Sequence, residues 1–231
     1  HIGKETLPFG IRLDSAIPQG KGMASSSADI AAVSYATARA LGRELTAQEI
    51  MDIAIAIEPS DGIAFAGLSH VSHTTGKLFG QYFNVPLLAV SIFDVGGTVD
   101  TIAYYRSKGN RGNHDEVYRQ LLDTVDQAFR TRDLQQEALL GQAATASARL
   151  NQVHLEKPKL EEFITAAQRQ GALGTLVAHS GTVVGVLWAS DLSAVDMAQQ
   201  TSELAAEFEA TYHYMQTVRL ISGGVVCEIR P

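Results

Sequence analysis

The stretch from residue 18 to residue 29, PQGKGMASSSAD, combines glycines and hydroxyl side chains in an order that suits phosphate binding. Gly20 and Gly22 come first, and glycines let main-chain N–H groups approach an anion because no Cβ is in the way. Three serines at positions 25–27 then open an alanine-rich segment that is typical of a helix. The first turn of such a helix offers unpaired N–H groups and a partial positive charge. The segment therefore predicts a glycine loop and a helix that hold phosphate, with hydroxyls available as donors or magnesium ligands.

This loop does not match two widespread phosphate-binding patterns. A P-loop requires a lysine followed directly by serine or threonine, whereas Lys21 is followed by Gly22. A dinucleotide-binding loop requires a third glycine where this chain has Ser25, and no acidic residue lies about 20 positions further on in the right setting. A purely structural helix start with serine caps is an alternative, since many helices begin this way. Two glycines, the preceding Pro18 and the serine triplet together favour a phosphate site.

Glu58 and Asp61 bring two carboxylates close together at a predicted helix break. Pro59 causes the break, because proline disfavours helical geometry in the residue before it. Phosphoryl transfer needs a metal ion on the phosphates and a group that orients or deprotonates the attacking hydroxyl, and these two side chains could provide both. In the alternative interpretation, Glu58 is a solvated helix end and Asp61 forms a turn beside Gly62. Their position about 30 residues after the glycine loop favours the chemical roles.

A later turn, Ala178-His-Ser-Gly-Thr182, consists of small residues that would let another main chain pass closely. His179 in this turn is either a substrate-side residue or a hydrogen-bonded turn histidine, and both alternatives stay open. In the serine triplet, Ser25 and Ser27 are expected to cap the helix while Ser26 faces a metal ion.

The remaining side chains that could do chemistry are weaker candidates. Lys21 either reaches a phosphate or points to solvent. His70 and His73 lack the third ligand and the spacing that a zinc site requires. Asp94 and Asp100 are expected to be a strand-end residue and a turn residue.

Composition narrows the class of protein. The 231 residues can form one or two domains, and a hydrophobic fraction of 45% is enough for a substantial core. The net charge of −7 and the lack of a Lys/Arg cluster argue against a nucleic-acid-binding surface. The single cysteine, Cys227, allows no internal disulfide and is expected as a core strand residue of a cytoplasmic protein. The sequence has no run of about 18 apolar residues and no visible signal peptide, so neither a membrane span nor export is expected.

Strand and helix patterns are mixed throughout the chain, which indicates an α+β architecture. Thr46 and Glu49 form a predicted capping box at the start of one helix, and Gly42 suits the end of the helix before it. We expect helices at 28–41, 46–57, 117–129, 133–150, 158–169 and 192–209; strands at 10–17, 85–93, 98–105, 174–178 and 212–220 and after Gly224; and a strand or helix at 183–188. The first helix should be largely buried. The second should bury a face formed by Ile50, Ile53, Ala54 and Ile57.

The pattern P-x-G-x-G-[LM]-[GA]-S-S-[SA] at residues 18–27 resembles the nucleotide loop of the GHMP small-molecule kinases, which include galactokinase, homoserine kinase and mevalonate kinase. The segment AHSGTVVG at 178–185 resembles a reduced form of their late glycine-rich motif. Together with IEPSDGIAF at 57–65, these strings are most similar to the L-threonine kinase branch of propanediol utilisation. In that branch, ATP phosphorylates the side-chain hydroxyl of L-threonine to O-phospho-L-threonine, which serves adenosylcobalamin synthesis.

The resemblance implies ATP and Mg²⁺ as cofactors and gives each motif a role. Ser26 and Glu58 would bind magnesium. Asp61 would orient or deprotonate the acceptor, and Lys21 is a second catalytic candidate. The substrate-side residues would be His179, Ser180 and Gly181. The residues implied to contact ATP are Pro18, Gly20, Lys21, Gly22, Met23, Ala24, Ser25, Ser26 and Ser27.

The resemblance also implies a two-lobed α+β fold, with a ribosomal-protein-S5-like N-terminal half and a ferredoxin-like C-terminal half. Gly109-Asn-Arg-Gly-Asn113 is the predicted boundary, so residues 1–109 would form a partial N-terminal ATP-binding domain and residues 110–231 the C-terminal domain. The branch normally has a further N-terminal portion, so the first strands of the fold are expected to be missing from a chain that begins at His1. The implied partner is a small-molecule acceptor. Another GHMP kinase activity, a non-catalytic ligand-binding regulator and a homodimer are open alternatives.

Overall fold

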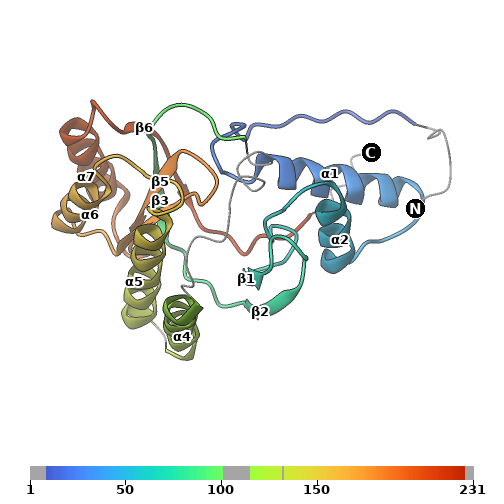
Figure 1. Cartoon of the computed structure of the whole chain (residues 1–231), viewed down its shortest axis with the longest axis horizontal. Helices are drawn as coiled ribbons and strands as arrows, with labels where there is room; N and C mark the ends of the chain where they lie inside the picture. The colour runs from blue at the N-terminus through green and yellow to red at the C-terminus, as the bar shows by residue number, and fades with distance from the viewer. Residues whose placement is uncertain (1–8, 101–114, 132, 227–231) are drawn as a thin grey trace. The chain divides into compact units, whose positions relative to one another are not determined.

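The structure is a computed structural model in which the chain forms two compact units (Figure 1). It describes residues 9–100, 115–131 and 133–226. Unit 1 comprises residues 1–17, 24–81 and 223–231, and unit 2 comprises residues 18–23 and 82–222. The predicted boundary at 109–113, most of the strand expected at 98–105, and Cys227 lie outside the described residues. A domain division at residue 109 therefore stays a prediction.

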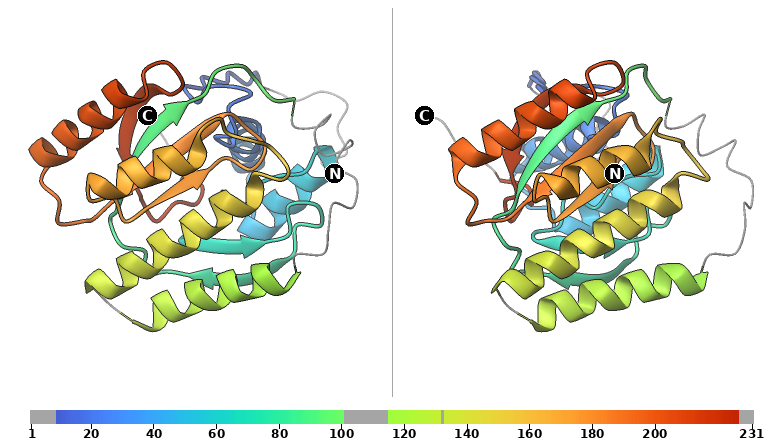
Figure 2. Two further views of the ribbon diagram at one scale, coloured as in Figure 1. Left: turned by 60° about the vertical axis from the view of Figure 1, so that its left-hand side comes forward. Right: turned by 90° about the vertical axis from the view of Figure 1, so that its left-hand side faces the viewer.

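Unit 2 is built on a four-stranded antiparallel sheet with the strand order β4-β5-β3-β6. Its strands are β3 (Ala89–Asp94), β4 (Gly174–Val177), β5 (Val183–Trp188) and β6 (His213–Arg219). Its helices are α4 (Asp115–Arg130), α5 (Asp133–Asn151), α6 (Leu160–Arg169) and α7 (Ala194–Glu207). Figure 2 shows α6 and α7 against the sheet and α4 beside α5. Because β3 pairs with β5 on one side and with β6 on the other, the position of its last residue, Asp94, is well defined.

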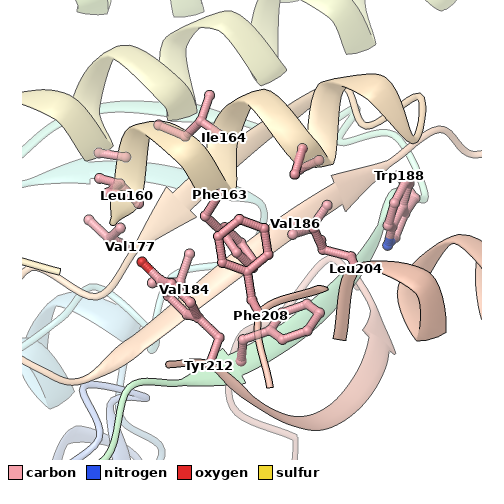
Figure 3. Close-up of a cluster of buried hydrophobic side chains, with 14 of the residues drawn as sticks. Leu160, Phe163, Ile164, Val177, Val184, Val186, Trp188, Leu204, Phe208 and Tyr212 are labelled. Carbon is pink, nitrogen blue, oxygen red and sulfur yellow. The ribbon is translucent and has the colours of Figure 1, made fainter. Parts of the chain in front are cut away.

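The main core of unit 2 lies between this sheet and helices α6 and α7 (Figure 3). The Phe163 ring stacks on Tyr212 with centroids 4.3 Å apart and meets Phe93 edge-on at 5.2 Å. Ser91 is a buried polar residue in β3, and its hydroxyl accepts a 2.8 Å hydrogen bond from Trp188 Nε1. Aromatic packing and a satisfied polar group therefore anchor the strand that ends at Asp94.

Unit 1 contains helices α1 (Ser25–Ala40) and α2 (Ala47–Ile57) and a two-stranded sheet of β1 (Leu68–Val71) and β2 (Leu78–Tyr82). The predicted capping box of α2 is confirmed. Thr46 Oγ1 accepts from Glu49 N at 3.2 Å, and Glu49 Oε2 accepts from Thr46 N at 2.8 Å. Gly42 follows α1 with a φ of +73°, as expected for the residue that ends a helix. The small core of this unit is centred on Ala31, Ile50 and Ala64.

The helices expected at 117–129, 133–150, 158–169 and 192–209 and the strands expected at 174–178 and 212–220 are confirmed within a few residues, and 183–188 is a strand. Residues 225 and 226 form no strand, and the rest of the strand expected after Gly224 lies outside the described residues. The strand expected at 10–17 is wrong: no described strand pairs with this segment, and Ile11 and Leu13 are 45% and 46% exposed. A regular alternation of side chains does not make a strand when the backbone groups find no partner.

Among the described residues, no helix has the length and apolar character needed to cross a membrane.

Other expectations about packing and strand length also need correction. Only four residues of α1 are buried, so the helix is not largely enclosed. In α2, Ile50 and Ala54 are buried as expected, whereas Ile53 and Ile57 are exposed and Met51 is buried in addition. The strand expected at 85–93 begins only at Ala89, since Pro86 cannot donate to a sheet. Residues 98–100 form no strand, and the short strands β1 and β2 were not predicted.

Candidate active site

The glycine loop, Pro18–Met23, is held in unit 2 by hydrogen bonds to its carbonyl groups. Lys21 O accepts from Thr182 N at 3.0 Å and from Val183 N at 3.3 Å, and Gly20 O accepts from Val99 N at 2.9 Å. In contrast, no main-chain N–H group of residues 19–23 donates a hydrogen bond to any described residue. The carbonyls of Gly20 and Lys21 are therefore engaged with the protein, whereas the loop N–H groups are available to an acceptor such as a phosphate.

Close packing explains why glycines are needed in both the glycine loop and the late turn that it contacts. Gly20 and Gly22 have φ values of +70° and +78°, a left-handed conformation that side chains disfavour. A Cβ on Gly22 would lie 2.5 Å from the Ala178 Cβ, and a Cβ on Gly181 would lie 2.1 Å from Lys21 O. The prediction that small residues in the late turn let another main chain pass closely is therefore confirmed, and that main chain is the glycine loop.

The Lys21 side chain is bound within unit 2. Its Nζ lies 2.5 Å from Asp94 Oδ2 and donates to Gly97 O at 2.7 Å. Asp94 Oδ1 accepts a 2.6 Å hydrogen bond from Thr182 Oγ1. Burial alone would raise the pKa of Asp94, but the hydrogen bonds from Lys21, Thr182 and the Gly96 N–H together hold that pKa below its usual value. The interpretation in which Lys21 points to solvent is therefore wrong, and Asp94 is more than a strand end.

The serine triplet opens α1 without capping it. Ala24 occupies the N-cap position in a left-handed conformation, with φ 57° and ψ 31°, and no side chain of the described residues caps the helix. The expected capping by Ser25 and Ser27 is therefore wrong. The buried Ser27 Oγ instead accepts a 3.2 Å hydrogen bond from Asp61 N, while Ser26 is exposed. Ser27 thus connects the start of α1 to the Glu58–Asp61 turn, a role that sequence spacing did not indicate.

The Glu58–Asp61 turn is fixed by its own main chain and by β1. Glu58 ends α2, and its N–H donates to Ala54 O at 2.9 Å. The buried Ser60 donates its N–H to His73 O at 2.9 Å and its hydroxyl to Glu58 O at 3.1 Å. A Cβ on Gly62 would lie 2.6 Å from Ser69 Oγ, so glycine lets the turn lie close to β1. These contacts therefore fix the main chain on which both carboxylates stand.

The two carboxylates differ in their surroundings. Glu58 Oε1 is buried and has no hydrogen-bond partner in the part of the chain that the structure describes, so Glu58 is not simply a solvated helix end. Asp61 keeps access to solvent, yet the surrounding protein desolvates it enough to raise its pKa. The Glu58 carboxylate raises this pKa further, and His73 opposes the shift. An unpaired buried oxygen at Glu58 suits a cation, and a more basic carboxylate at Asp61 suits a proton.

The remaining predicted site residues lie in or near the late turn, in unit 2. His179 is exposed, and its Nε2 lies 3.0 Å from Ser147 Oγ of α5, which fits a hydrogen-bonded turn histidine. Gly181 is buried against the loop, and Ser180 is partly exposed beside it. Among the described residues, no group of three or more His, Cys, Asp or Glu side chains could hold a metal ion. A cation at Glu58 would therefore take its other ligands from hydroxyl, phosphate or water oxygens.

Comparison with known proteins shows which family the chain belongs to. Residues 1–69 match the family model for the GHMP kinases N terminal domain. The chain is 32% identical over 221 residues to L-threonine kinase from Salmonella typhimurium, covering 93% of this chain and 72% of that protein. It is 30% identical over 225 residues to L-threonine kinase from Citrobacter freundii, covering 95% and 76%. The chain belongs to the GHMP kinase family.

The fold agrees with this assignment. The structure of homoserine kinase from Cytophaga hutchinsonii is similar with a TM-score of 0.60, over 90% of this chain and 68% of that one, at 17% sequence identity. The two-lobed GHMP kinase fold expected from the motifs is therefore confirmed. The chain is an ATP-dependent kinase with an alcohol group as acceptor.

Proposed function

We propose that this kinase transfers the γ-phosphate of ATP to the side-chain hydroxyl of L-threonine and forms O-phospho-L-threonine for adenosylcobalamin synthesis. The observation that carries the proposal is the similarity to two proteins named L-threonine kinase, which extends over nearly the whole chain at 32% and 30% identity. The likeness to homoserine kinase, at 17% identity, supports the fold alone. We place the reaction in the cytoplasm, where ATP and free amino acids are available.

In this proposal the glycine loop holds the ATP phosphates. The carbonyls of Gly20 and Lys21 are engaged with the protein, the loop N–H groups are available, and residues 20, 22 and 24 all have positive φ values. Left-handed residues at alternate positions turn successive N–H groups toward the same side, which makes a concave site for an anion. The first turn of α1 adds the partial positive charge of a helix N-terminus. Residues 18–27 therefore neutralise phosphate charge mainly through the main chain.

Ser26 and Glu58 fit a magnesium ion that accompanies ATP. Mg²⁺ prefers hard oxygen ligands and takes few of them from protein side chains when phosphates supply the others. Glu58 offers a buried carboxylate oxygen without a partner in the described chain, and Ser26 offers an exposed hydroxyl. When bound, the ion would offset the charge that develops on the phosphates during transfer.

Asp61 is proposed to orient the acceptor hydroxyl and to take its proton. The hydroxyl oxygen forms a bond to the γ-phosphorus, the bond from that phosphorus to the β,γ-bridging oxygen breaks, and the hydroxyl proton passes to the Asp61 carboxylate. The raised pKa of Asp61 makes it a better proton acceptor than an ordinary aspartate. His179, Ser180 and Gly181 are proposed to contribute to the acceptor side.

A phosphate-transfer assay across candidate acceptors tests the proposal. ATP labelled on its γ-phosphate is incubated with the chain and L-threonine, L-serine, L-homoserine, mevalonate or a sugar, each in turn. We expect the highest kcat/KM with L-threonine, and product analysis should find phosphate on the side-chain oxygen. A clear preference for homoserine would reject threonine as the substrate while retaining kinase activity. Nucleotide binding without transfer to any acceptor would favour a ligand-binding regulator.

A further inference from the structure

Asp94 is the charged residue at the centre of the contacts that hold the glycine loop. Its Oδ2 lies 2.5 Å from Lys21 Nζ, and its Oδ1 accepts a 2.6 Å hydrogen bond from Thr182 Oγ1. Thr182 also donates its main-chain N–H to Lys21 O at 3.0 Å. The Asp94 carboxylate therefore contacts both the Lys21 side chain and Thr182, and Thr182 in turn binds the Lys21 main chain.

Burial distinguishes this ion pair from the other ion pairs between described residues. The side chains of Lys21 and Asp94 are 18% and 14% exposed, whereas those of the Arg149–Glu161 pair are 50% and 60% exposed. Exposed pairs add little stability, but shielded charge-assisted hydrogen bonds are shorter and stronger. The Lys21 ammonium has three hydrogens, of which Asp94 and Gly97 O accept two. The charge of Lys21 is thus balanced within the protein itself.

We propose that Asp94 is a positioning residue of the nucleotide loop and that Lys21 is a tether rather than a phosphate ligand. The proposal rests on the assignment of this loop to the ATP phosphates. Through Lys21 and Thr182, Asp94 holds the loop so that the Lys21 carbonyl is bound by Thr182 N and the loop N–H groups stay available. Preorganised N–H groups bind an anion without the entropic cost of ordering the loop.

The two possible roles of Lys21 lead to opposite expectations. If Lys21 is a tether, Lys21→Met and Asp94→Asn break the same contact, and each weakens nucleotide binding. If Lys21 is a phosphate ligand that Asp94 restrains, Asp94→Asn frees a cation and removes a negative charge. Nucleotide binding would then tighten in Asp94→Asn and weaken in Lys21→Met.

Isothermal titration calorimetry of the full chain with ADP measures these effects directly. We expect each single variant to raise the Kd for ADP roughly tenfold, the scale of one charge-assisted hydrogen bond. The double variant should be no weaker than either single variant, because both changes remove one contact. Asp94→Glu should recover part of the affinity. Tighter or unchanged ADP binding by a folded Asp94→Asn variant, or additive losses in the double variant, would overturn the proposal.

Matched variants separate this role from a general effect on folding. Glu161→Gln removes the exposed pair with Arg149 in the same unit and should leave ADP affinity unchanged. If Asp94→Asn does not fold, Thr182→Val removes only the hydroxyl contact to Asp94 and should weaken ADP binding in the same direction. Unchanged affinity in both Thr182→Val and Lys21→Met would reject the tether.

The ADP measurement also keeps this proposal separate from the choice of acceptor. ADP binding needs no acceptor. A chain that phosphorylates homoserine instead of threonine would therefore still show the expected changes in the Kd for ADP among the variants. If the unaltered chain binds no ADP, the assignment of the loop to ATP is rejected, and so is the proposed role of Asp94 and Lys21 in positioning that loop.

Discussion

At the scale of single residues, Glu58 and Asp61 lie in one turn but have different chemical surroundings. Glu58 Oε1 is buried without a hydrogen-bond partner among the described residues, while Asp61 has solvent access and a raised pKa. A buried acceptor without a partner costs on the order of 1–3 kcal/mol, and a bound cation would remove this cost. Glu58 therefore suits the binding of a cation, and Asp61 suits the acceptance of a proton.

We expect Glu58→Gln to reduce kcat about a hundredfold, because an amide oxygen lacks the charge that holds a divalent cation. The variant should also lose the dependence of ADP affinity on Mg²⁺ that the unaltered chain is expected to show. Calorimetric titrations with and without Mg²⁺ check this. Near-normal turnover at saturating Mg²⁺ would remove Glu58 from the site.

We expect Asp61→Asn to lower kcat strongly, to retain ATP binding and to raise stability at neutral pH. Because the folded-state pKa of Asp61 is raised, its ionised form is disfavoured in the native state, and stability is lost as the pH rises through that pKa. Asparagine removes this loss. Thermal unfolding should therefore show a higher Tm for the variant at pH 7.5 and a smaller difference as the pH falls toward 4. Loss of ATP binding would instead indicate a structural role.

Lys157 provides a test of stability away from the site. It is 1% exposed, its Nζ donates to Leu155 O at 3.3 Å, and burial lowers its pKa to about 8. Stability is therefore lost as the pH falls through 8, because the ammonium form is disfavoured in the folded state. Lys157→Met should raise the free energy of unfolding at pH 7 by about 2 kcal/mol and flatten its dependence on pH between 7 and 10. Urea unfolding at several pH values measures both, and a less stable variant at pH 7 would contradict the expectation.

At the scale of elements, the glycine loop and the late turn act as one packed unit. A Cβ on Gly181 would lie 2.1 Å from Lys21 O, so Gly181→Ala must push the loop away from Thr182. We expect this variant to lose roughly 1–3 kcal/mol of stability and at least tenfold in ADP affinity. Gly10→Ala is the control, since a Cβ there would meet no heavy atom within 4 Å. Equal ADP affinity in both variants would show that the contact does not shape the loop.

The sequence predicted those elements whose signals are local. The capping box of Thr46 and Glu49 and the break at Pro59 gave both ends of α2, because each involves residues within one turn. The contact of Lys21 with Asp94 joins residues 73 positions apart, and no spacing rule indicates it. The short strands β1 and β2 carry too few residues for a clear alternation. The segment 10–17 shows the reverse case, in which the alternation is present without a paired strand.

The candidate site was predictable to a similar extent. The motifs single out candidate side chains, since Ser26, Glu58 and Asp61 stand in recognisable strings, and their roles stay predictions. The partners of those side chains depend on the fold. The sequence predicts Ser27 as a helix cap, yet its hydroxyl accepts from Asp61 N, because the left-handed Ala24 takes the N-cap position. Contacts of this kind follow from tertiary packing, which overrides a local preference.

At the scale of the whole molecule, the chain passes between its two units several times. Residues 18–23 belong to unit 2, although the segments before and after them belong to unit 1. The loop is therefore assigned with Asp94 and Thr182, while Ser26, Glu58 and Asp61 are assigned together in unit 1. The hydrogen bonds given above for each group join residues of one unit.

This assignment has a practical consequence for protein engineering. A chimera that receives residues 24–81 from another GHMP kinase would exchange the serine triplet and both carboxylates in one continuous graft. The host would keep its own loop lysine matched to its own aspartate, because both lie outside the transplanted segment. A graft that began a few residues earlier would separate that lysine from its partner, so junctions placed at residue 24 should give better-folded hybrids.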